Sequence, residues 1–137
     1  MPARQESCCF TGHRPAKLPW GYREEDPRCV TLKARISDAV TLAWQEGYRH
    51  FICGMAQGCD LYFCEAVLAL REQHPEITVE AAIPCPTQAD SRRDRYMVDH
   101  SMLLIAAFDG SAGGTRYTVE YALRQGIEIF DVSIPTE

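Results

Sequence analysis

Three short segments of this sequence carry glycines next to polar residues, a combination suited to binding an anion. They are Gly12-His13-Arg14-Pro15, 54–60 (GMAQGCD) and 109–115 (DGSAGGT). Each follows an apolar run of strand length, and the last two precede a helical pattern. Backbone N–H groups at a strand-to-helix turn point toward an anion, and glycine leaves room for it to approach. The three segments together predict one ligand crevice.

The third segment carries the clearest phosphate signal. Gly113 and Gly114 remove side chains where a phosphate needs access to the backbone, and Thr115 and Thr118 either cap the helix or donate hydroxyls. Glu120 is expected in the first helical turn, where the helix dipole favours a carboxylate. The alternative is a tight turn followed by ordinary helix-start residues. Neither the G-x-G-x-x-G fingerprint of dinucleotide-binding folds nor the G-K-[ST] of a P-loop is present.

The first two segments offer charged side chains with two interpretations each. Arg14 can hold a phosphate through its planar guanidinium, and His13 is either structural or catalytic. Asp60 either caps the helix that follows it or binds ribose hydroxyls. Arg92, Arg93 and Arg95 form either a solvated face or a further phosphate contact.

Strands must alternate with helices to place these segments at one edge of a sheet. Strands are expected over 7–11, 48–53, 77–83, 103–108 and 128–132. Helices are expected from Asp26-Pro27 to a stop at Gly47 and over 61–73 and 115–125, with a turn or short helix over 91–100. This order predicts an α/β fold with a mainly parallel sheet of about five strands and helices on both faces. In such sheets ligands bind at the carboxyl ends of the strands, near the topological switch point.

Composition limits the class of protein. The chain of 137 residues fits a single domain over 1–137, and its formal net charge of −5 makes nucleic acid an improbable partner. No apolar run approaches the roughly 20 residues that cross a bilayer, and the polar N-terminus lacks a signal peptide, so we expect no membrane partner and a cytoplasmic location. Seven cysteines without a C-x-x-C pair suggest reduced thiols and no metal, with Cys53 or Cys85 as a candidate reactive thiol. The loop with Trp20 and Tyr22 either covers the core or exposes these rings for stacking.

Four segments carry a family resemblance: 9–15 (CFTGHRP), 51–60 (FICGMAQGCD), 82–88 (AIPCPTQ) and 113–122 (GGTRYTVEYA). Together they resemble the YpsA-like family of the SLOG superfamily, named after DNA-processing protein A (Smf) and the Lonely Guy enzymes. The resemblance implies a Rossmann-like three-layer sandwich in the bacterial cytoplasm that binds a nucleotide or an ADP-ribose-like ligand. It implies no resident cofactor and no settled enzymatic activity.

The turns and these segments define the candidate ligand-binding residues. These are Thr11, Gly12, His13, Arg14, Gly54, Met55, Gly58, Asp60, Pro84, Asp109, Gly113, Gly114, Thr115, Thr118 and Glu120.

The sequence departs from its relatives in two places. Lonely Guy enzymes carry P-G-G-x-G-T-x-x-E and hydrolyse the N-glycosidic bond of nucleoside monophosphates. Here the proline and the third glycine are missing and Glu120, the candidate catalytic residue, is spaced differently. The family also has roughly another helix and strand where this sequence has the abrupt Asp90–Ser91 junction. Either the protein is naturally shorter, or the sequence lacks that segment.

Three functions remain open at this stage. The first is a nucleotide-binding sensor or regulator, and the second is a nucleoside-monophosphate phosphoribohydrolase. The third, a DNA-associated protein, would show salt-dependent DNA binding. The apolar helix around 61–70 is a candidate dimer face in any of them.

Overall fold

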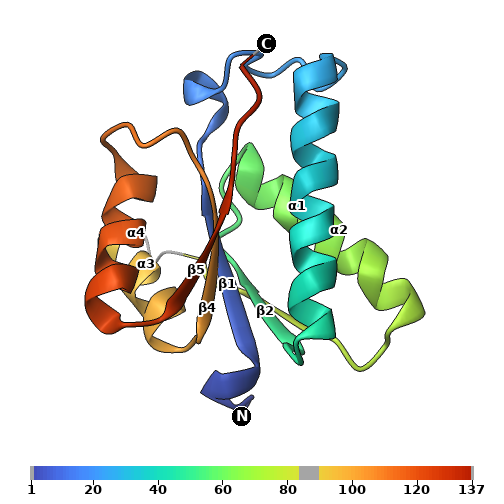
Figure 1. The fold of residues 1–137 in the computed structure, drawn as a ribbon, viewed down its shortest axis with the longest axis vertical. Coiled ribbons are helices and arrows are strands. Elements are labelled where there is room, and N and C mark those ends of the chain that lie inside the picture. The colour runs from blue at the N-terminus through green and yellow to red at the C-terminus, as the bar shows by residue number, and fades with distance from the viewer. Residues whose placement is uncertain (1, 84–89, 137) are drawn as a thin grey trace.

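A computed structural model describes residues 2–83 and 90–136 (Figure 1). Within these residues the chain forms five strands, four α-helices and two short 3₁₀-helices, Arg4–Glu6 and Pro15–Lys17. The strands are β1 (Ser7–Gly12), β2 (His50–Cys53), β3 (Thr78–Ala81), β4 (Leu103–Ala107) and β5 (Glu128–Val132). The helices are α1 (Pro27–Gln45), α2 (Cys59–Gln73), α3 (Asp90–Asp99) and α4 (Gly114–Gln125).

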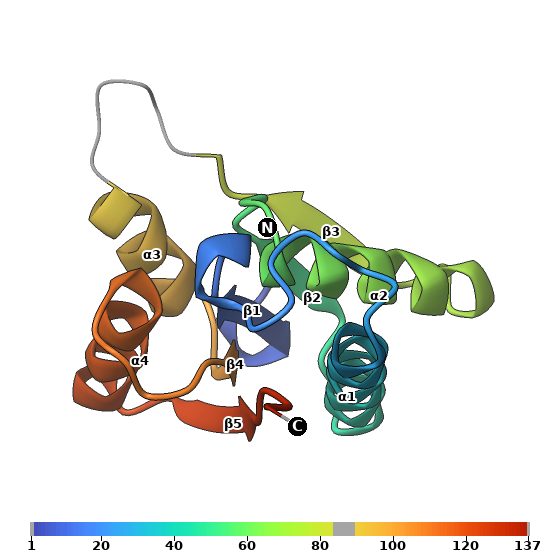
Figure 2. The same ribbon diagram turned by 90° about the horizontal axis from the view of Figure 1, so that it is seen from above.

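All strand pairs in the sheet are parallel, in the order β3-β2-β1-β4-β5. β1 is central, and Cys8 pairs with Phe51 of β2 on one side and Leu103 of β4 on the other. The chain moves outward from β1 first through β2 and β3, then returns to start β4, so the switch point lies between β1 and β4. Figure 2 shows α1 and α2 on one side of the sheet and α3 and α4 on the other. The predicted Rossmann-like three-layer fold is confirmed.

Two apolar clusters, one on each face, hold the layers together. Along β1, Cys8 and Phe10 pack toward α1 and α2, while Cys9 packs toward α3 and α4. This alternation follows from the twofold period of a strand buried on both faces. The face of α1 that we predicted to be apolar is fully buried: Cys29, Leu32, Ile36, Ala39, Val40 and Ala43. The helical spacing of these residues therefore predicted the packing as well as the helix.

The ends of the helices follow the expected capping chemistry in two cases. The Asp26 side chain accepts a hydrogen bond from the backbone N–H of Arg28 at 2.9 Å and caps α1, with Pro27 as its first residue. Gly126 ends α4 in the left-handed conformation, as its position after a helical pattern predicted.

The start of α2 differs from the prediction. The helix begins at Cys59, and its N-cap is Gly58 at φ 84°, so Asp60 lies in the first turn and is not the cap. A glycine is suited to this position because a Cβ there would lie 2.9 Å from the carbonyl oxygen of His13. β2 and β3 are also shorter than predicted, and 91–100 forms most of a regular helix, α3.

The aromatic loop before α1 divides between core and surface. Trp20 is buried in the cluster under α1 and α2, whereas Tyr22 is 73% exposed and donates a hydrogen bond to Gln57 Oε1 at 3.2 Å. On α2, Leu61 and Leu68 are exposed, and a dimer face there stays a prediction. Among the described residues, none of the helices combines the length and hydrophobicity needed to cross a bilayer.

Candidate functional site

A cavity of about 390 Å³ lies beside the carboxyl end of β1, at the switch point of the sheet. The end of β1 and the loop after it form one wall, and α3 and the first residues of α4 form others. Ala56 and Asp60, from the second glycine turn and the start of α2, complete the lining. The cavity therefore brings together parts of all three segments with anion-binding character.

The N-terminus of α4 is open toward this cavity. Its N-cap is Gly113, at φ 145°, and no side chain caps the first backbone N–H groups. Gly114 and Thr115 line the cavity, and a Cβ on Gly114 would meet nothing within 4 Å. The buried hydroxyl of Thr11 donates to that of Thr115 at 3.3 Å, so these two threonines join β1 to α4.

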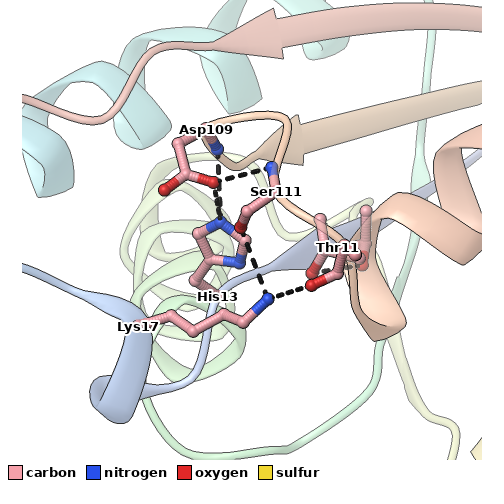
Figure 3. A network of polar contacts seen from close by, with 7 residues as sticks. Thr11, His13, Lys17, Asp109 and Ser111 are labelled. Atoms are coloured by element: carbon pink, nitrogen blue, oxygen red, sulfur yellow. Dashed lines mark hydrogen bonds and ion pairs between the residues drawn. The ribbon is translucent and has the colours of Figure 1, made fainter.

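Lys17 places a cation next to the glycine turn. The 3₁₀-helix after β1 carries this residue to the turn, where its Nζ donates to the carbonyl oxygen of Ala112 and lies 3.4 Å from Ser111 Oγ (Figure 3). A Cβ on Gly113 would lie 2.7 Å from Nζ, so glycine gives this ammonium its space. We did not predict Lys17 as a site residue. Its signal in the sequence is its position three residues after Arg14 in a loop that begins at a strand end.

His13 and Asp109 connect the first and third glycine turns. Nε2 of His13 lies 2.9 Å from Asp109 Oδ1 and 3.2 Å from the Asp109 backbone nitrogen (Figure 3). The His13 side chain is buried and lines the cavity, while that of Asp109 is half exposed. Hydrogen bonds from Ser111, with a smaller effect of His13, hold the pKa of Asp109 well below its usual range. The ionised Asp109 therefore fixes the imidazole and the turn together.

A second charged group lines the cavity: Asp60, Arg93 and Asp94. Asp60 is buried, its Oδ2 accepts a hydrogen bond from the Ala56 N–H at 3.1 Å, and burial raises its pKa to about 6. Arg93 donates to the Gly54 carbonyl at 3.3 Å and to Asp94 Oδ1 at 3.4 Å. The cavity thus has hydroxyls, helix N–H groups and Lys17 in one part of its lining, and two buried carboxylates with Arg93 in another.

The predictions for Thr118 and Glu120, both on α4, need correction. The Thr118 hydroxyl is buried and donates to the Gly114 carbonyl at 3.0 Å, so it neither caps the helix nor lines the cavity. Glu120 is not in the first turn, because α4 begins at Gly114 and Glu120 is its seventh residue. Its exposed carboxylate lies 3.7 Å from Arg116, outside the residues that line the cavity.

The other candidates fall into three groups. Of the three arginines on α3, Arg93 lines the cavity, and Arg92 and Arg95 are exposed and do not. Cys53 is fully buried and burial raises its thiol pKa, which makes it a poor nucleophile. Pro84 and Cys85 lie outside the described residues.

A neighbouring depression of about 370 Å³ lies over the second glycine turn and borders the cavity. It shares Arg14, Ala56 and Arg93 with the cavity. Its remaining lining is Gly54, Met55, Gln57 and Ile83. Among the described residues, no group of three or more His, Cys, Asp or Glu side chains is placed to hold a metal ion.

Comparison with protein families gives one match. The YpsA model, that of the YspA SLOG family, matches residues 8–92, which is more than half of the chain. The matched region runs from β1 into α3 and includes the first two glycine turns, whereas the third turn lies beyond it. No curated protein matches the chain.

Proposed function

Since the chain belongs to the YspA SLOG family, we propose that it binds a nucleotide or nucleotide-derived ligand in the cavity beside β1 and acts as a sensor or regulator. The observation that carries this proposal is the uncapped N-terminus of α4, which opens on the cavity with Lys17 beside it. An anion there would receive backbone N–H groups, the helix dipole and an ammonium at once.

The carboxylate part of the cavity suits the remainder of such a ligand. Asp60 lines this part of the cavity, and one oxygen of its carboxylate accepts from the Ala56 N–H. A carboxylate accepts hydrogen bonds from ribose hydroxyls. A ligand with a phosphate at one end and sugar hydroxyls further along therefore fits the charges of the cavity.

A panel of AMP, ADP-ribose and a nucleotide sugar tests the proposal by calorimetry and thermal shift. We expect at least one micromolar binder, and we expect Gly114→Arg to abolish its stabilisation because the new side chain fills the cavity mouth. Leu68→Arg, which adds the same side chain to an exposed position of α2, should leave binding unchanged. A panel in which nothing stabilises the protein would contradict the proposal.

Lys17→Gln should weaken binding of the phosphorylated ligand by roughly 10- to 100-fold, because a hydrogen bond to a charged group contributes about 1.5–3 kcal/mol. The affinity of the variant should also depend less on salt. Titration calorimetry at two salt concentrations measures both effects. Lys33→Gln, which removes the ammonium paired with Glu24 at 2.6 Å on another surface, is the matched control. Equal losses in both variants would show that Lys17 acts only through net charge.

A hydrolase is the second candidate, and one observation favours it. Asp60 lines the cavity with a pKa raised by burial to about 6, which suits proton transfer near neutral pH. In this form of the hypothesis Asp60 takes the part that the sequence suggested for Glu120. Release of free base from AMP by the wild type, but not by Asp60→Asn, would support it. No release over a long incubation would exclude it for AMP.

A further inference from the structure

The depression over the second glycine turn borders the cavity proposed to bind the phosphate. Arg14, Ala56 and Arg93 belong to the walls of both. A ligand anchored in the cavity would therefore reach the depression by passing these shared residues.

Two large apolar side chains line this depression and are exposed to solvent. Met55 is 41% exposed and Ile83 is 73% exposed. Apolar surface that lines a concave site beside polar groups is typical of a ligand-binding pocket. The guanidinium of Arg14 adds a flat cation to the lining, a group that stacks well on planar rings.

The backbone at Met55 is held in an unusual conformation. Within the described residues, Met55 is the one non-glycine residue with positive φ, at 63°. Glycine adopts this region freely, and asparagine does so at a lower cost than other residues with a Cβ. Hydrogen bonds on both sides maintain it, from Arg93 to the Gly54 carbonyl and from the Ala56 N–H to Asp60. The surrounding structure therefore holds the exposed Met55 side chain on a backbone conformation that methionine disfavours.

We propose that this depression receives the planar ring of the ligand, a nucleobase, which packs against Met55, Ile83 and Arg14. The inference rests on the proposed function and specifies that a nucleotide, and not a simple sugar phosphate, is the ligand. The thioether of Met55 makes favourable contacts with aromatic rings and adapts to different ring shapes. Gln57 lies at the edge with its Oε1 held by the Tyr22 hydroxyl at 3.2 Å, and its amide can donate to the edge of the ring.

The test compares ribose 5-phosphate with AMP, GMP, CMP and UMP by titration calorimetry. At least one nucleotide should bind the wild type about tenfold or more tightly than ribose 5-phosphate, the increment that one stacked base contributes. Met55→Gly should reduce that difference several-fold and leave ribose 5-phosphate binding unchanged. The same variant should melt at the same or a higher temperature, because glycine accepts the backbone conformation of residue 55.

Two further variants complete the experiment. Met55→Leu restores an apolar side chain at the same position and should recover most of the nucleotide preference. Leu68→Ala removes an apolar side chain of similar exposure, 46%, from the outer surface of α2 and should change nothing.

The outcomes separate the two proposals. If the nucleotides and ribose 5-phosphate bind equally, or if Met55→Gly leaves their ratio intact, the ring site is wrong and the phosphate site stands. If neither kind of ligand binds the wild type, the proposed function fails, and the ring site fails with it.

Discussion

Replacing Gly12 with alanine is expected to lower the free energy of unfolding by about 3 kcal/mol. The new Cβ would lie 2.4 Å from Cβ of Cys59 and 2.9 Å from two ring atoms of Phe10. Both neighbours are buried in the cluster under α1 and α2, so neither side chain can move aside without disturbing its own packing. Urea denaturation followed by circular dichroism measures the loss as a lower midpoint with an unchanged slope.

Gly114→Ala is the matched control for this substitution. No heavy atom lies within 4 Å of the Cβ that it adds, and residue 114 begins α4. We expect its free energy of unfolding to stay within about 0.5 kcal/mol of the wild type, because alanine favours the helix without meeting a neighbour. If Gly12→Ala were equally harmless, the close approach of β1 to α2 would not be what requires glycine there.

The second large effect is a pH dependence that comes from Asp60. Burial raises its folded pKa to about 6, above its ordinary value of 3.8 in an unfolded chain. The protein therefore loses stability as pH rises from about 4 to about 6, because the unfolded state ionises this carboxyl first. A shift of this size amounts to about 3 kcal/mol above pH 6. Asp26 and Asp109 contribute to the pH dependence of stability with the opposite sign. Their pKa values are lowered in the folded state, so they stabilise it until pH falls below about 4.

Asp60→Asn isolates this contribution from the rest of the titration curve. Asparagine keeps an oxygen for the Ala56 N–H and removes the ionisation. The variant should be more stable than the wild type by about 3 kcal/mol at pH 7, with that advantage disappearing toward pH 4. Urea unfolding of both proteins at pH 4, 5.5 and 7 measures the difference. A difference that does not change with pH would mean that Asp60 titrates normally.

Local sequence predicted the helices and strands well where a hydrophobic period or a capping residue determines their bounds. The 3.6-residue spacing from Cys29 to Ala43 identified every buried position of α1, and the strand over 128–132 has the predicted bounds. Gly126 and Asp26 were predictable because their backbone roles depend on immediate neighbours.

The composition of the site was only partly predictable, since it depends on how separate elements pack. Arg92, Arg93 and Arg95 look alike in sequence, and only the packing of α3 beside β1 selects Arg93. Asp94 was missed, although it lies three residues before the buried Met97 and so on the same helical face. The start of α4 was predicted to within one residue, although a glycine acts as its cap and no side chain marks the boundary. Glu120 lies beyond the first turn from either start, because it is sixth from residue 115 and seventh from Gly114.

The central place of β1 has a consequence for how the chain is synthesised. Cys8 pairs with Phe51 on one side, but its partner on the other side, Leu103, lies 103 − 8 = 95 residues further along. A growing chain can thus pair β1 with β2 early and must wait for most of its length before β4 covers the other edge. During that interval an apolar strand edge stays open to other chains. The cavity beside β1 also forms only then, so a ligand that binds it cannot assist folding before α4 has been made.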